Sequence, residues 1–110
     1  MKVNQFEVVR VNLDPTVGKE MKKDRPCVVI SPNELNYALG TVIIAPITTT
    51  ARGDMPWRPR CITKGTSRFG EIALDQLRVI DKEKRIIKFE DELDRPAVLQ
   101  VKRILAEMFN

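Results

Sequence analysis

The chain has 110 residues, of which 43% are hydrophobic and 31% charged, with a net charge of +4 and no histidine. This length suits one folded domain spanning residues 1–110, and the composition argues against extended disorder. The longest uncharged apolar stretch, residues 37–50, is too short to cross a bilayer, and Glu7 and Arg10 interrupt any secretory leader. We therefore expect a cytoplasmic domain with no membrane partner.

The first half of the chain predicts three strands. Residues 6–13 alternate valines with polar side chains, which is typical of a half-buried strand. Residues 27–30 are continuously apolar, as in a central strand, and residues 41–47 are β-branched and apolar. A polar loop over residues 16–24 is expected to join the first two strands.

The second half predicts shorter elements and one helix. Residues 51–59 contain a glycine and two prolines and are expected to form a loop. Val98, Val101, Leu105 and Met108 recur at helical spacing, and Asp94 is a suitable N-terminal cap. We expect this helix to dock on a small curled sheet or barrel. Four further short strands are expected at residues 60–63, 71–74, 77–80 and 85–89.

The cysteine and histidine content limits the available chemistry. Cys27 and Cys61 lie far apart in the sequence, and in a cytosolic protein we expect two reduced thiols. Without histidine or a CxxC pair, the usual zinc ligand sets are absent, as is the commonest general acid and base. We expect no metal and no cofactor.

The cations are unevenly distributed, with a basic stretch over residues 51–68. Such a stretch suits a polyanion such as nucleic acid, although an ordinary solvated surface is the alternative. Residues 90–94 form an acidic patch near the end of the chain. Within residues 51–68 the cations, opposed only by Asp54, are Arg52, Arg58, Arg60, Lys64 and Arg68.

Three residues near predicted strand ends suggest phosphodiester chemistry. Arg25 starts one strand, and its guanidinium can bind a phosphate and neutralise a phosphorane-like transition state. Thr48 ends another strand and can donate a further hydrogen bond. Glu20 can accept the proton of a ribose 2′-hydroxyl, which then attacks the adjacent phosphorus. The alternative is structural: Arg25 pairs with Asp24 or Glu20, and Thr48 caps a turn.

The chain resembles the MazF/PemK (Kid) toxins of bacterial toxin-antitoxin systems over nearly its whole length. The resemblance rests on an ordered set of motifs at the family's spacing: Asp14-Pro15-Thr16, Gly18, Glu20, Arg25-Pro26, Val28-Val29-Ile30-Ser31-Pro32, Pro46-Ile47-Thr48-Thr49 and Leu74-Asp75-Gln76.

This resemblance implies a mainly β fold, an SH3-like small β-barrel with a C-terminal α-helix, that works as a homodimer. It also implies sequence-specific, ribosome-independent cleavage of single-stranded RNA to 2′,3′-cyclic phosphate and 5′-hydroxyl ends, restrained by an antitoxin with an acidic tail. Glu20, Arg25 and Thr48 match positions tied to activity. The residues that we expect to bind RNA are Lys19, Lys22, Lys23, Thr49, Arg52, Arg58, Asp75 and Gln76.

Some positions depart from the Kid branch, which has histidine in place of Lys19 and arginine in place of Ala73. Asp75 matches the base proposed for that branch, but it can equally be a structural carboxylate. Two other functions stay open on the same scaffold: a non-catalytic toxin like CcdB, which poisons DNA gyrase, and a silent RNA-binding module.

Overall fold

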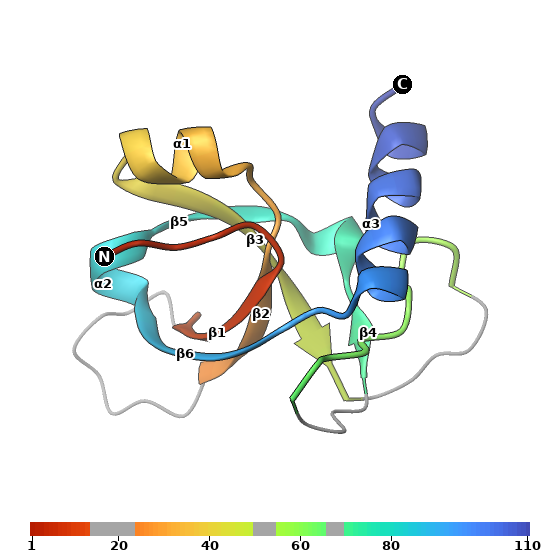
Figure 1. The fold of residues 1–110 in the computed structure, drawn as a ribbon, viewed down its shortest axis with the longest axis horizontal. Coiled ribbons are helices and arrows are strands. Elements are labelled where there is room, and N and C mark those ends of the chain that lie inside the picture. Colours follow the sequence, from red (N-terminus) through yellow and green to blue (C-terminus); the bar gives the residue numbers. More distant parts are fainter. Residues whose placement is uncertain (14–23, 50–54, 66–69) are drawn as a thin grey trace.

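The computed structural model describes residues 1–13, 24–49, 55–65 and 70–110, and Figure 1 shows their arrangement. Six strands are present: β1 (Glu7–Asn12), β2 (Asp24–Val29), β3 (Thr41–Thr48), β4 (Glu71–Ile72), β5 (Arg78–Asp81) and β6 (Ile86–Glu92). The helical elements are α1 (Asn33–Ala38), a 3-10 turn (Leu74–Gln76), α2 (Lys82–Arg85) and α3 (Arg95–Met108). Five predicted site residues lie outside the described residues: Lys19, Glu20, Lys22, Lys23 and Arg52.

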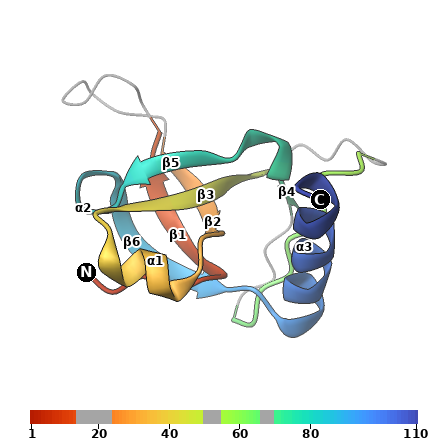
Figure 2. The same ribbon diagram turned by 90° about the horizontal axis from the view of Figure 1, so that it is seen from above.

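The strands form one antiparallel sheet in the order β4-β3-β2-β1-β6, and β5 pairs with β3. Figures 1 and 2 show that this sheet is curled, with α3 standing at one end. The predicted mainly β fold with a C-terminal helix is therefore confirmed. Most predicted strands are present with ends shifted by a few residues, which is ordinary for strand boundaries.

The curled sheet is barrel-like without being closed by a continuous ladder. Residues 59–64 run between its two edges and contact each through backbone hydrogen bonds, from Ile72 N to the Pro59 carbonyl (2.8 Å) and from Lys64 N to the Glu92 carbonyl (3.0 Å). The strand predicted at residues 60–63 was wrong, because only isolated bridges form there. The segment changes its partner from β4 to the end of β6 within a few residues, so no ladder extends along it.

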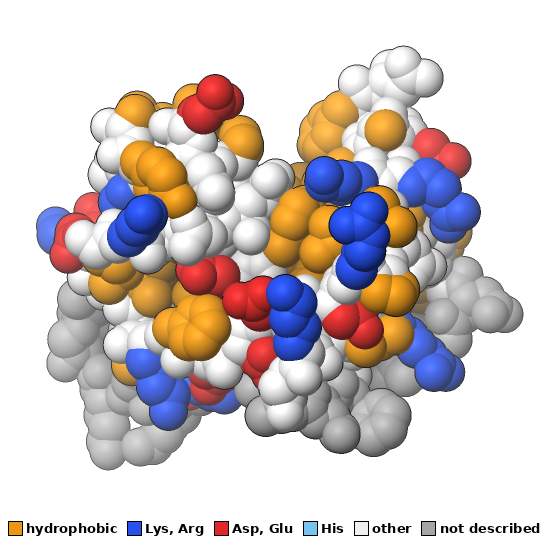
Figure 3. All heavy atoms as spheres, viewed as in Figure 1, with side chains coloured by type: hydrophobic (Ala, Val, Ile, Leu, Met, Phe, Trp, Pro, Cys, Tyr) orange, Lys and Arg blue, Asp and Glu red, His pale blue; other side chains and the backbone are white. Residues whose placement is uncertain are grey.

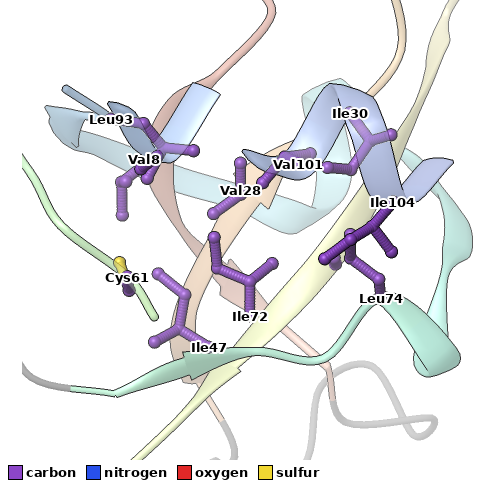
Figure 4. Close-up of a cluster of buried hydrophobic side chains, with 12 residues drawn as sticks. Val8, Val28, Ile30, Ile47, Cys61, Ile72, Leu74, Leu93, Val101 and Ile104 are labelled. Carbon is purple, nitrogen blue, oxygen red and sulfur yellow. The ribbon is translucent and has the colours of Figure 1, made fainter. Parts of the chain in front are cut away.

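Two clusters of buried side chains lie on opposite faces of the sheet. Because side chains alternate along a strand, the central strands are buried on both faces. The first cluster packs against α3, as Figure 4 shows, and contains Val8, Val28, Ile30, Ala45, Ile47, Cys61, Ile72, Leu74, Leu93, Ala97, Val101 and Ile104. The second cluster contains Val3, Val9, Val11, Cys27, Val29, Val42, Ile44, Ile80 and Ile86.

Helix α3 begins as the sequence predicts. The Asp94 carboxylate accepts a hydrogen bond from the backbone N–H of Ala97 at 3.0 Å, which satisfies one otherwise unpaired donor of the first turn. Ala97, Val101 and Ile104 are buried against the sheet, so the apolar stripe packs on the protein's own core. No helix in the described part of the chain is long and apolar enough to cross a membrane.

Short helices α1 and α2 were not predicted. Helix α1 is held by a buried polar network in which the Asn36 side-chain amide donates to the Ser31 carbonyl at 2.8 Å. The buried Lys82 ammonium of α2 donates to the carbonyl of Asn36, at the end of α1. These contacts join segments far apart in sequence, and each helix is too short to show a clear apolar period.

Candidate functional site

A cleft of about 420 Å³ opens beside the second cluster. Its walls come from the end of β1, from β2, β3 and β5, and from the 3-10 turn. The volume falls within the range typical of ligand sites. Three apolar side chains and three hydrogen-bonding ones share the lining, a composition suited to a ligand with both apolar and anionic parts. The lining residues are Leu13, Arg25, Pro46, Gln76, Leu77 and Arg78.

Sheet register brings Arg25 and Thr48 to the same end of the site. Strands β2 and β3 pair through Cys27 and Pro46, and continuing this antiparallel register by two residues places Arg25 opposite Thr48. Alternation puts the Arg25 side chain on the same face as Cys27, which belongs to the second cluster. On its other side Thr48 pairs with the buried Glu71 of β4.

The Arg25 guanidinium is not neutralised by its neighbour Asp24. Asp24 instead accepts from Arg10 at 3.2 Å, and Arg10 also donates to Glu90 at 2.7 Å. The hydrogen bond to Glu90 is the main cause of the raised pKa of Arg10. Across the described residues, Arg25 forms no ion pair.

Arg58 and Asp75 form a bidentate ion pair beside the cleft. The Arg58 Nε donates to one Asp75 oxygen at 3.0 Å and an Arg58 terminal nitrogen donates to the other at 3.1 Å. This hydrogen bond to Asp75 is the main cause of the raised pKa of Arg58. A parallel pair of N–H···O bonds fixes both side chains in one plane, so each restricts the orientation of the other.

The Cys27 thiol lies beneath this site and is fully buried. Burial raises its pKa to about 12, although the charges of Arg25, Arg78 and Arg10 act in the opposite direction. Cys27 and Cys61 are both free cysteines, in agreement with the prediction of reduced thiols. Among the described residues, no group of three or more His, Cys, Asp or Glu side chains is arranged to hold a metal ion.

Residues 4–109 match the model of the family described as the PemK-like, MazF-like toxin of type II toxin-antitoxin systems. The chain belongs to this toxin family. The match covers almost the whole chain, as the ordered motifs of the sequence predict.

Relatives of this toxin family agree in sequence and fold. The chain is 34% identical over 74 residues to the endoribonuclease toxin MazF of Escherichia coli K12, a match that spans 67% of this chain and 64% of that protein. The crystal structure of Deinococcus radiodurans MazF is similar with a TM-score of 0.79 and 23% identity, over 99% of this chain and 97% of that one. A mycobacterial endoribonuclease in complex with its cognate antitoxin has a TM-score of 0.79 and 18% identity, over 97% of this chain and 94% of that one. At these identities the structural matches establish the fold.

The predicted site residues of this MazF-like chain divide into separate groups. Arg25 and Gln76 line the cleft, and Thr48 lies on the neighbouring strand with Thr49 exposed directly after it. Arg58 and Asp75 contact each other. The other five, Lys19, Glu20, Lys22, Lys23 and Arg52, lie outside the described residues, and their roles stay predictions.

Sequence reasoning missed Arg78 and the apolar walls of the cleft. Arg78 lies on β5, opposite Ile44 of β3, and its side chain is exposed. A signal was present in the sequence, because Arg78 is a cation inside a predicted apolar strand and lies two residues after the Leu74-Asp75-Gln76 motif. Its proximity to Arg25 depends on strand pairing across the sheet, which the sequence did not reveal.

Proposed function

We propose that this chain is a sequence-specific, ribosome-independent endoribonuclease that cleaves single-stranded RNA as the toxin of a toxin-antitoxin system. The observation that carries the proposal is the cleft in which Arg25 and Arg78, neither paired with a described carboxylate, face apolar walls. Such a surface suits the phosphates and bases of a single strand. Membership of the toxin family and the naming of its E. coli relative as an endoribonuclease toxin support it.

The proposed reaction is an internal transesterification. The 2′-hydroxyl loses its proton to a base, for which we propose Glu20, and its oxygen attacks the adjacent phosphorus. Arg25 and Thr48 donate hydrogen bonds to the pentacoordinate phosphorus group as negative charge develops on its oxygens. The bond from phosphorus to the 5′-oxygen then breaks, and that oxygen takes a proton from water. The products are a 2′,3′-cyclic phosphate and a 5′-hydroxyl. No metal is required, because the nucleophile belongs to the substrate.

The proposed partners follow from the charge of the cleft and from family membership. An antitoxin with an acidic tail would place carboxylates beside Arg25 and Arg78 and thereby compete with RNA phosphates. We further propose that residues 1–110 form one toxin domain that works as a homodimer in the cytoplasm. Sedimentation showing only the 12.6 kDa monomer at micromolar concentration would contradict the homodimer.

The test is cleavage of a long unstructured RNA by the purified chain in excess EDTA, with fragment ends identified by mass spectrometry. We expect discrete fragments with cyclic phosphate ends. Arg25→Ala should abolish detectable cleavage, whereas Glu20→Gln should slow it by roughly 10²-fold, because a weak base contributes less than a transition-state cation. Arg103→Ala, which removes an exposed arginine of α3, is the matched control. Intact RNA would instead favour a toxin that acts by binding.

A further inference from the structure

The second arginine of the cleft has no role in the reaction proposed above. Arg78 is on β5 and Arg25 is on β2, and both strands pair with β3, so the two arginines flank one strand. Neighbouring strands lie about 4.8 Å apart, which places the backbones of β2 and β5 on the order of 10 Å apart across β3. Pro46 of β3 lies between them in the lining of the cleft.

The two arginines differ from their neighbours in pairing. Arg10 and Arg58 each bind carboxylates at 2.7–3.2 Å. Within the described ranges, neither Arg25 nor Arg78 forms an ion pair. Both side chains line the same cleft. Two unpaired like charges that line one cleft repel each other, and anions bound between or beside them relieve this repulsion.

The β3 residues that lie opposite the two arginines indicate that Arg25 and Arg78 bind different phosphates. Arg78 pairs with Ile44, and the register of β2 with β3, continued by two residues beyond Cys27 and Pro46, sets Arg25 opposite Thr48, four residues further along β3. Four residues of strand correspond to roughly 13 Å. If Arg25 and Thr48 hold the scissile phosphate, Arg78 is displaced along the cleft toward a flanking one.

We propose that Arg78 is a positioning residue that binds an RNA phosphate flanking the scissile phosphate, while Arg25 acts on the scissile phosphate itself. This inference rests on the proposed endoribonuclease function and extends it to a residue outside the predicted site. Its physical basis is the charge-assisted, two-pronged hydrogen bonding that a guanidinium offers to a phosphate.

The experiment uses a short single-stranded RNA that contains a cleavage site mapped with the wild-type chain. One set of oligonucleotides carries a 2′-deoxy sugar at the cleavage position and is used for binding. A second set also carries one neutral methylphosphonate at each phosphate in turn. The proteins are wild type, Arg78→Ala, Arg78→Lys and the control Arg103→Ala, all checked for unchanged thermal unfolding.

We expect Arg78→Ala to raise KM by roughly 10- to 100-fold, as for loss of a charge-assisted hydrogen bond, with kcat nearly unchanged. The salt dependence of its binding, log K against log salt, should be shallower by about 0.7. Arg78→Lys should keep that slope while losing part of the affinity. Neutralising one phosphate that flanks the scissile one should weaken wild-type binding and leave Arg78→Ala unaffected.

Other results would overturn the inference in distinguishable ways. If wild type cleaves but Arg78→Ala behaves like Arg103→Ala, the role of Arg78 is wrong and the proposed function stands. The role of Arg78 is also wrong, and the proposed function still stands, if the loss of affinity from Arg78→Ala adds to the loss from neutralisation at every phosphate. Additivity would mean that no single phosphate depends on Arg78. A loss of kcat as large as in Arg25→Ala would assign Arg78 to the chemical step instead. If wild type neither cleaves nor binds RNA, the proposed function fails and Arg78 loses its role with it.

Discussion

The contact with Arg58 limits the roles that the Asp75 side chain can have. Both of its carboxylate oxygens accept hydrogen bonds from Arg58, at 3.0 and 3.1 Å. A general base must direct an oxygen lone pair at the 2′-hydroxyl within hydrogen-bonding distance. The observed geometry uses one lone pair of each oxygen for Arg58 and favours a structural role for Asp75, in which it orients the Arg58 guanidinium.

Replacing Asp75 should therefore resemble replacing Arg58. We expect Asp75→Asn and Arg58→Ala each to slow cleavage by less than roughly tenfold, whereas loss of a general base costs about 10²- to 10⁴-fold. The double variant should be little worse than either single one, because each change disrupts the same pair. Single-turnover rates measured across pH test this expectation. Additive losses, or loss of the acidic limb of the profile in Asp75→Asn alone, would restore Asp75 as the base.

The buried Cys27 thiol should make the free energy of unfolding depend on pH. Burial raises its pKa from 9.0 to about 12, so the folded chain keeps a proton that the unfolded chain loses above about pH 9. Stability must then fall between pH 9 and 12, at about 1.4 kcal/mol per pH unit for one group. The contribution is fully present below pH 9.

Urea unfolding at several pH values should show this difference when Cys27→Ala is compared with wild type. The variant loses packing at every pH, but its stability should decline less steeply between pH 9 and 12. Every other contribution to the pH dependence is common to both proteins and cancels in the comparison. Parallel stability curves would show that the thiol does not titrate as its burial requires.

At the scale of elements, the cap of α3 is the contact most easily tested. Asp94→Ala removes the side-chain acceptor for the Ala97 N–H and should lower the free energy of unfolding by about 1 kcal/mol. Asp94→Asn keeps an acceptor oxygen and should lose much less. Chemical denaturation measures both variants, and equal losses in the two would mean that charge, and not capping, stabilises this end of the helix.

The elements that the sequence predicted best are those with a clear apolar pattern, either continuous or periodic. Residues 27–30 are continuously apolar because β2 is central and both of its faces are covered. Helix α3 has a long apolar stripe and a cap, and both signals are local. The fold could therefore be predicted from the sequence, with the family resemblance supplying the curled topology.

The elements that were missed depend on distant partners. Helix α1 is fixed by contacts of Asn36 with Ser31 and Lys82, and the isolated bridges at Arg60 and Thr63 depend on two different edges of the sheet. The candidate site shows the same limit. Arg25 was predicted because a motif marks it, whereas the approach of Arg78 to it requires the pairing of β5 with β3.

At the scale of the whole molecule, the modest net charge of +4 is distributed unevenly. The face in Figure 3 carries basic and acidic side chains side by side, so it offers no continuous surface of one sign. On this face, a polyanion would have to bind through local groups of cations. The cleft supplies two of them, and the sequence places Lys22 and Lys23 in the loop that precedes β2.

The salt dependence of RNA binding measures how many of these cations contact phosphates. Each contact on a single strand contributes about 0.7 to the slope of log K against log salt, so Lys22→Ala with Lys23→Ala should make it shallower by about 1.4. Lys102→Ala with Arg103→Ala removes two exposed cations of α3 and should leave the slope unchanged. Titrations of uncleavable RNA at several salt concentrations give both values. An unchanged slope in the loop variant would mean that these lysines are only solvated and that the cleft arginines carry most of the electrostatic attraction.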